Sequence, residues 1–230
     1  KIKLNVKIFA VIIVFTLILC AVFSGVGIVR GLTDSAPDIN EENIMPDGYP
    51  SIIYDANGKK VQKLMGINAN REYKKITDIP ECVQNAFVAI EDARFYKHSG
   101  VDLQGILRAV FSALSDEKMT QGASTITQQL LKNQVFGGGN EKSFFGKVSR
   151  KIQEQSLAIK LESTIDKKKI LEYYLNTINL GQNTMGVETA SKRYFGKSVS
   201  KLTVSEAAVL AGITQNPTEY NPITEQQNNE

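Results

Sequence analysis

Two adjacent acidic residues, Glu91 and Asp92, come at the end of an apolar, periodic segment that follows Pro80. The apolar stripe of this segment is formed by Val83, Phe87 and Ile90. Successive helical residues are turned by about 100°, so Glu91 lies at the edge of this stripe and Asp92 points nearly opposite. A carboxylate that is partly removed from water has a raised pKa and accepts protons better near neutral pH. We therefore expect Glu91 to be the less hydrated of the two acids and a candidate general base.

The same spacing fits a plainer interpretation of Glu91. Arg94 follows three residues later, and such a pair commonly forms a solvated ion pair on a helix surface. The one histidine of the chain, His98, is more often a structural hydrogen-bonding residue than a catalyst. Spacing alone leaves both roles open for Glu91.

A second group of polar residues surrounds an expected helix start. Thr125 and Gln128 fit a capping box, and the free N–H groups of a helix start attract anions. Gln128, Gln129 and Lys132 lie within one turn of each other and form a polar face with one cation. This face suits a phosphate, and an ordinary capped helix is the alternative.

A third group combines two cations with one acid, because Arg150, Lys151 and Glu154 share a helix face at separations of three and four. Arginine binds phosphate oxygens through two parallel hydrogen bonds and lysine acts as a point charge. The pair therefore suits a diphosphate, with Glu154 orienting the cations or an acceptor. A solvated ion pair is the alternative.

Between the second and third groups lies a stretch, 134–148, that joins the glycines of 137–139 to aromatic residues and lysines. Its aromatic and basic members are Phe136, Phe144, Phe145, Lys142 and Lys147. Such a composition fits a mobile segment that rests on an anionic membrane surface, and a disordered loop fits equally well.

The elements that must position these groups are mainly helical. Helical periodicity is found after Pro80 and in 101–114, 124–135, 149–163, 167–176, 186–194 and 205–215. Residues 51–64 place β-prone residues on both sides of Asn57-Gly58, which predicts a small structural hairpin.

The first residues decide the compartment. Residues 8–29 form an uncharged apolar run, long enough at about 1.5 Å per helical residue to cross a hydrocarbon core of about 30 Å. The run exceeds the apolar core of a signal peptide and lacks a clean cleavage site, so we predict a retained anchor. Lys1, Lys3 and Lys7 precede it and acidic residues follow it, so the rest of the chain should face outward.

Composition excludes several kinds of site. Cys20 lies inside the apolar run and Cys82 in a predicted helix, so no disulfide is expected, and one histidine gives no zinc cluster. A formal charge of +3 does not indicate nucleic-acid binding. We divide the chain into four parts: an N-terminal stub and transmembrane helix (1–30), a linker and hairpin region (31–75), a helical domain (76–222) and a polar tail (223–230).

Five segments together are more specific than any one group. They are EDARFYKHSG, GASTITQQLLKN, RKIQEQSLAIKLE, ILEYYLNTINLGQNTMGVETASKRYFGK and SEAAVLAGITQNPTEYNP. In this order they resemble the peptidoglycan glycosyltransferase family, glycosyltransferase family 51. This family comprises the transglycosylase module of class A penicillin-binding proteins and the monofunctional cell-wall transglycosylases. The resemblance runs from about residue 79 to residue 222.

The resemblance implies a lysozyme-like, mainly α-helical fold that acts on lipid II, the undecaprenyl-diphosphate-linked disaccharide pentapeptide. Glu91 matches the base that removes the proton of the acceptor's 4-hydroxyl group. That oxygen attacks the anomeric carbon of the donor chain, and inversion gives a β-1,4 link. Glu91 and Glu154 are the candidate catalytic residues. Residues that match the family's binding residues are Lys132, Arg150 and Lys151 for the leaving diphosphate, and Ser124, Gln128, Gln129 and Glu154 for substrate positioning.

The resemblance also implies that a divalent cation, Mg²⁺ or Mn²⁺, assists some members, with Glu154 or Asp92 as the groups that would contact it. No ligand set in the sequence demands this ion, so no cofactor is required. The stretch 137–147 is longer than the family pattern, and a further basic contact expected there is not assigned to Lys142 or Lys147.

The expected partners are lipid II, the growing lipid-linked glycan chain, membrane lipids and other cell-wall synthesis proteins. The expected location is a bacterial cytoplasmic membrane, with the catalytic domain on the outer side. Two alternatives remain: a lytic, lysozyme-like enzyme and a non-catalytic membrane-anchored scaffold. Lysis needs a second carboxylic acid of raised pKa, whereas a diphosphate leaving group needs cations, so the residues favour transfer.

Overall fold

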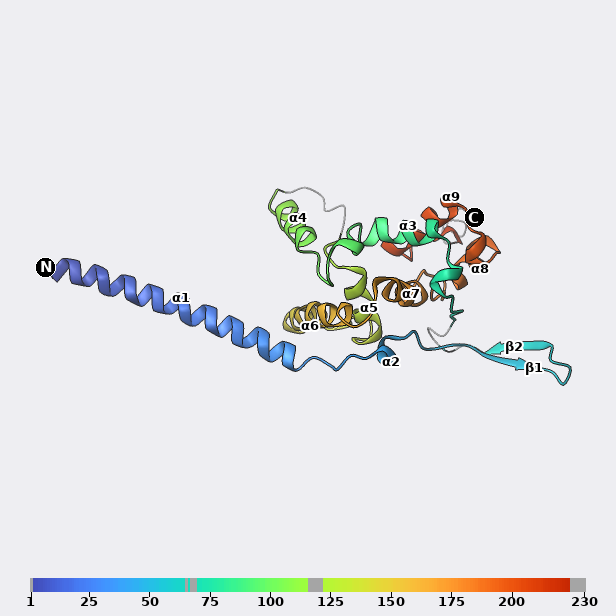
Figure 1. Cartoon of the computed structure of the whole chain (residues 1–230), viewed down its shortest axis with the longest axis horizontal. Coiled ribbons are helices and arrows are strands. Elements are labelled where there is room, and N and C mark those ends of the chain that lie inside the picture. The colour runs from blue at the N-terminus through green and yellow to red at the C-terminus, as the bar shows by residue number, and fades with distance from the viewer. Residues whose placement is uncertain (1, 65, 67–69, 116–121, 224–230) are drawn as a thin grey trace.

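The computed structural model describes residues 2–64, 66, 70–115 and 122–223, and it confirms a mainly helical chain with one small antiparallel sheet (Figure 1). The α-helices are α1 (Ile2–Asp34), α2 (Glu41–Ile44), α3 (Glu81–Glu91), α4 (Leu103–Leu114), α5 (Ile126–Gln134), α6 (Phe144–Glu162), α7 (Lys167–Thr177), α8 (Val187–Phe195) and α9 (Val204–Gly212). Four 3₁₀ turns are Ile76–Asp78, Phe95–Lys97, Val199–Lys201 and Ile213–Gln215. Except for Ile223, the predicted polar tail lies outside the described residues.

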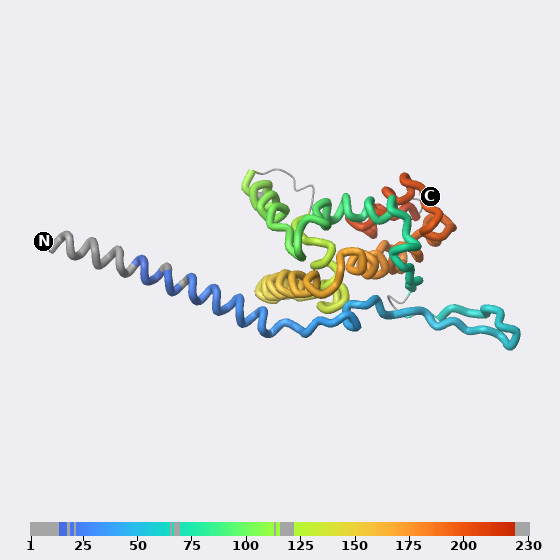
Figure 2. The backbone as a smooth tube through the Cα atoms, in the orientation of Figure 1, coloured from blue at the N-terminus to red at the C-terminus, as the bar shows by residue number. Residues whose placement is uncertain are grey.

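Helix α1 leaves the body of the molecule and extends far from it (Figures 1 and 2). Within the part of the chain that the structure describes, it is the one helix long and apolar enough to cross a membrane, by length and composition over Val14–Asp34. Its end is tied to the body where the Gln153 amide donates to the Leu32 carbonyl at 3.1 Å. The apolar run therefore forms the continuous helix that a membrane anchor needs.

The segment after α1, which the sequence predicts to be a linker, also contributes to the core. Helix α2 begins with a capping box and places Ile44, which is fully buried, against α5. The Tyr173 hydroxyl donates to Glu41 Oε1 at 2.5 Å. This part of the linker is thus packed onto the domain, because its single apolar side chain fills a place between helices.

The predicted hairpin is present, with strand β1 (Ser51–Tyr54) paired antiparallel to β2 (Lys60–Leu64). Gly58 has a φ of +76°, the left-handed conformation that the Asn-Gly turn requires. The hairpin extends from the body at the end opposite α1 (Figure 1).

Helix α7 forms the centre of the core, and all of its residues from 170 to 177 are buried. Helix α5 packs against both α6 and α7, and α3 packs against α9. A fully buried helix also buries polar side chains, which must find partners. The Asn176 amide donates to the Lys74 carbonyl at 2.8 Å, and Glu172 accepts from Lys169 Nζ at 2.7 Å.

Helix α6 begins at Phe144, five residues before the predicted start at 149. Ser143 explains the difference, because its hydroxyl accepts from the Gly146 N–H at 3.0 Å and caps the helix. The loop between α5 and α6 therefore spans residues 135–143 and contains a turn at 137–139, whose three glycines all have positive φ. Phe144 is 83% exposed, and membrane contact of this helix start stays a prediction.

Candidate active site

Glu91 is the last residue of α3, and neutral groups hold its carboxylate. Oε2 accepts from Gln129 Nε2 at 2.8 Å, and Oε1 accepts from Gln215 Nε2 at 3.0 Å and from the Thr214 hydroxyl. Among the described residues, no ion pair includes Glu91. The alternative pairing of Glu91 with Arg94 is wrong, because Arg94 Nε pairs instead with Asp102 Oδ1 at 3.1 Å. Glu91 is thus oriented without being neutralised.

Asp92 corrects one prediction, because it is the more buried of the two acids. Its exposed fraction is 7%, whereas Glu91 is half-buried. Helix α3 ends at Glu91, and Asp92 has φ −156° and ψ 72°, so the 100° step of a helix does not apply to it. Asp92 Oδ2 accepts from the N–H of Ile126, the first residue of α5, at 3.1 Å. One acid of the pair is therefore available to the site while the other joins two helix ends.

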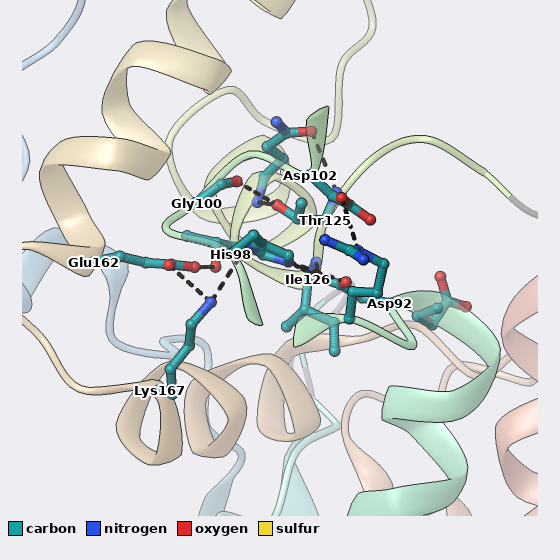
Figure 3. A network of polar contacts seen from close by, with 12 residues as sticks. Asp92, His98, Gly100, Asp102, Thr125, Ile126, Glu162 and Lys167 are labelled. Carbon is teal, nitrogen blue, oxygen red and sulfur yellow. Dashed lines mark hydrogen bonds and ion pairs between the residues drawn. The ribbon is translucent and has the colours of Figure 1, made fainter. Parts of the chain in front are cut away.

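A buried polar network extends from Asp92 (Figure 3). His98 Nε2 lies 2.9 Å from Asp92 Oδ2, and His98 Nδ1 lies 3.5 Å from Lys167 Nζ. Lys167 in turn pairs with Glu162 at 2.7 Å, and Glu162 accepts from the Thr127 hydroxyl. The structural role predicted for His98 is confirmed, because the network fixes α5 relative to α3, α6 and α7.

Gly100 holds the loop after His98 close to α6. Its φ is +90°, and a Cβ there would lie 2.5 Å from the Ala158 carbonyl carbon, so no other residue fits. The Gly100 carbonyl accepts from the Thr125 hydroxyl at 2.7 Å. This hydrogen bond fixes Thr125, the residue that caps α5, against the loop at Gly100.

Helix α5 begins as predicted, with the Thr125–Gln128 capping box. Gln128 is 3% exposed and turned back into this cap, so the structure does not bring it to the surface that Gln129 and Lys132 share. Gln129 reaches Glu91, as described above. The roles predicted for Gln128 and Gln129 in substrate binding stay predictions.

In α6, Glu154 is fully buried between the two predicted cations. Lys151 Nζ lies 2.8 Å from Glu154 Oε2, and Arg150 donates to Glu154 Oε1. The solvated ion pair is therefore the wrong alternative. Glu141, from the stretch before α6, accepts from Arg150 Nε at 2.7 Å. Burial alone would lower the pKa of Arg150, but its bonds to Glu141 and Glu154 outweigh burial and raise that pKa.

Lys132 adjoins these cations, because Gly139 packs against both. A Cβ on Gly139 would lie 3.0 Å from Lys132 Cε and 3.0 Å from Arg150 Cζ. Within the described ranges Lys132 has no ion pair. The hydrogen bond from Arg150, above all, and the positive charges of Arg150 and Lys132 hold the pKa of Glu141 below its usual value. We call Lys132, Arg150 and Lys151 the cation cluster.

One cleft relates the acid to the cation cluster. Its lining includes Glu91, Ser124 and Arg108. The Lys151 ammonium donates to Ser124 Oγ at 3.0 Å, so one cation of the cluster is bound directly to the cleft wall. Gln129, which binds Glu91, and Lys132 lie three residues apart on α5. Two contacts thus connect Glu91 and the cleft to the helices that carry the cluster: Gln129 of α5 binds Glu91, and Lys151 of α6 binds Ser124.

The residues named for a divalent cation do not fit a resident ion. Both oxygens of Glu154 face Arg150 or Lys151, and both oxygens of Asp92 contact His98. A cation would have to displace these positive or donating groups, at a cost of buried hydrogen bonds. We therefore assign no step to a metal.

A known protein family matches most of this chain. The family model described as "Transglycosylase" matches residues 57–230. The chain belongs to the transglycosylase family. The match covers every helix that contributes a residue to the cleft.

Penicillin-binding protein 1A of Clostridium botulinum is 42% identical to this transglycosylase chain over 202 residues, which are 86% of the chain and 24% of that protein. The protein of the same name from Clostridium tetani is 38% identical over 227 residues, or 96% of the chain and 28% of that protein. The protein of the same name from Neisseria lactamica is 47% identical over 176 residues, which are 76% of the chain and 21% of that protein. The chain thus spans about a quarter of the length of the curated relatives it matches.

Sequence reasoning missed three contacts of this transglycosylase site. Thr214 and Gln215 orient Glu91, and Glu141 holds Arg150. Thr214 and Gln215 lie in the fifth segment of the resemblance, which was the available signal, although their polar type alone gives them no role. Glu141 follows a glycine turn, and only the fold shows that the turn brings it back to α6.

Proposed function

We propose that this chain is a peptidoglycan glycosyltransferase that polymerises lipid II into β-1,4-linked glycan strands, with inversion and release of undecaprenyl diphosphate. Membership of the transglycosylase family supports the reaction class. The observation that carries the proposal is the cleft in which Glu91, which has no ion pair with any described residue, lies with a serine that is bound to Lys151.

In the proposed reaction Glu91 accepts the proton of the acceptor's 4-hydroxyl group. The acceptor oxygen attacks the anomeric carbon of the donor from the face opposite the diphosphate. The new C–O bond forms as the bond to the diphosphate breaks, so the configuration inverts and both electrons of that bond leave with the phosphate. The proton on Glu91 is then released to solvent, and the base is restored.

The cation cluster stabilises the departing diphosphate in this proposal. Glu154 holds Arg150 and Lys151 in place, and Lys132 has no ion pair within the described chain, so its charge is available to the ligand. Fixed cations stabilise charge that develops on a leaving group without reorganising during the reaction. Phosphate oxygens accept strong bonds from arginine and lysine.

Lysis fits the site less well. A glycosidase usually protonates the leaving sugar oxygen with a second carboxylic acid beside the first. The other acids that line the cleft, Asp92 and Asp102, are both buried, and they are bound to His98 and to Arg94. A non-catalytic scaffold would not need an oriented, unpaired Glu91.

We further propose that the cleft lies beside the membrane surface, on the outer side of the cytoplasmic membrane. Helix α4 contributes Arg108 to the cleft, while its apolar face is exposed. That face consists of Leu103, Leu107, Val110, Phe111 and Leu114. Helix α4 lies toward the end of the body from which α1 departs (Figure 1). A lipid-linked substrate would enter such a cleft from the bilayer, and other cell-wall proteins are proposed as further partners.

Labelled lipid II in detergent tests the proposal. The purified full chain should convert it to long glycan and release undecaprenyl diphosphate in equal molar amount to the links formed. A matched incubation with preformed glycan strands separates the alternatives. Shortened strands with lipid II left unused would establish a lytic enzyme instead.

A further inference from the structure

Arg71 is a buried cation in which two guanidinium nitrogens have no acceptor in the described part of the chain. It is 3% exposed, and the two nitrogens are Nε and Nη1. The nearest acid, Asp47, lies 3.9 Å from Nη1, too far for a hydrogen bond, and its side chain is 95% exposed. Burial lowers the pKa of Arg71, and the charge of Asp47 opposes this effect. Native structures rarely leave a buried guanidinium without acceptors, which indicates that a ligand supplies them.

Arg71 lines an open cavity of roughly 300 Å³. Asn133 and Asn179 also line it, and the Asn133 amide forms no hydrogen bond with any described residue. The charged residues of the lining are Arg71 and Asp47. The cavity therefore offers a guanidinium and a neutral amide to a ligand of low charge.

The cavity adjoins the cation cluster across the glycine turn. Gly137 and Gly138 line the cavity, while Gly139 packs against Lys132 and Arg150. The Gly138 N–H donates to the Lys132 carbonyl at 2.9 Å, so the turn is fixed to the end of α5. A substrate bound at the cluster needs to extend only past this turn to reach Arg71.

We propose that the Arg71 cavity binds a carboxylate of the peptide carried by the glycan substrate, an inference that rests on the proposed function. A carboxylate has one negative charge and accepts hydrogen bonds from a planar guanidinium. A diphosphate has more charge and is better matched by the three cations of the cluster. The exposed side chain of Asp47, which forms no hydrogen bond with Arg71, is displaced from Arg71 when the ligand enters.

Two substrates test the inference: lipid II with free peptide carboxylates and lipid II with those carboxylates amidated. The wild-type chain should use the free form with about tenfold higher kcat/KM, the value of one hydrogen bond to a charged group. Arg71→Gln should remove this preference, and Arg71→Lys should retain part of it. Asp47→Asn, an exposed change that leaves the core intact, should increase the preference by removing a competing carboxylate.

Soluble muramyl pentapeptide, its amidated form and inorganic phosphate provide a direct titration of the same chains in detergent. Binding of the free peptide alone, abolished by Arg71→Gln, is the expected result. Phosphate bound in its place would overturn the carboxylate assignment. Equal use of the two lipid II forms by an active wild-type chain would refute the inference and leave the proposed function standing. An inactive wild-type chain would refute the proposed function, and the peptide titration would still decide whether the cavity binds carboxylate.

Discussion

Glu91 and Glu154 are the same residue type in opposite surroundings. Glu91 is half-buried at the cleft and accepts from the amides of Gln129 and Gln215 and the hydroxyl of Thr214. Glu154 is fully buried and faces Arg150 and Lys151. Neutral donors orient a carboxylate without compensating its negative charge, which can then act on a substrate. Cations that pair with a carboxylate compensate that charge. We therefore expect Glu91 to take part in the chemistry and Glu154 to position Arg150 and Lys151.

The largest effect should follow Glu91→Gln, which keeps the shape and removes the proton acceptor. We expect kcat/KM on lipid II to fall about 10²–10⁴-fold, the usual contribution of a general base. Thermal unfolding should change little, because no ion pair of the described residues is lost and the amide keeps one acceptor oxygen for the neutral donors around Glu91. Glu81→Gln, an exposed change in the first turn of the same helix, is the matched control and should retain full activity. An active Glu91→Gln chain would remove the assigned base.

Glu154→Gln should show the opposite profile, with stability as its main effect. Removing the buried carboxylate leaves Arg150 with Glu141 as its one acidic partner and Lys151 without its ion pair to Glu154. We therefore expect a loss of about 3 kcal/mol in the free energy of unfolding. Denaturant unfolding in detergent measures this loss, with Gln155→Ala on the exposed face of α6 as the control. Unchanged stability together with lost activity would instead make Glu154 a reacting group.

Lys132→Met tests the one member of the cation cluster that has no acidic partner among the described residues. Because Lys132 has no ion pair in the described part of the chain, stability should change little. We expect kcat/KM to fall about 10–100-fold through the loss of one bond to a charged phosphate. Lys168→Met, an exposed lysine of α7, should behave as wild type. Equal activity of the two variants would exclude Lys132 from diphosphate binding.

A third glutamate, Glu206, gives the smallest effect and a reference outside the cleft. Its hydrogen bonds, first with Lys197 and then with the capping residue Thr203, lower its pKa from 4.5 to about 2. A depressed pKa stabilises the fold above pH 4.5, and this stabilisation disappears as pH falls toward 2. The melting temperature of the wild type should therefore fall more steeply over this window than that of Glu206→Gln. Parallel curves would contradict the assignment.

Periodicity and capping residues predicted most of the fold. The apolar N-terminal helix, the Asn57-Gly58 hairpin and the capping box at Thr125 depend on local chemistry and are all confirmed, whereas the use of that helix as a membrane anchor stays a prediction. The start of α6 was placed five residues late because Phe144 and Phe145 interrupt the polar pattern. Only the serine cap before them marks the true start.

The site was predicted in its residue types and less well in its contacts. Spacing brought Arg150, Lys151 and Glu154 together, because they lie on one helix. Asp92 was misplaced, since a helical angle was extended one residue past the helix end. Arg71 and Thr214 come from segments remote in sequence, and no local pattern indicates that the fold brings them to the cavity or to Glu91.

The central claim is that Glu91 performs the chemistry in the cleft, while the cation cluster, which is joined to the cleft wall by the Lys151–Ser124 hydrogen bond, binds the diphosphate. Equilibrium binding of labelled lipid II to the inactive Glu91→Gln chain tests it directly. The Glu91→Gln chain should bind lipid II saturably. Adding Lys132→Met to that chain should raise the dissociation constant about tenfold or more. Binding abolished by Glu91→Gln itself, or unaffected by the added Lys132→Met, would contradict the account.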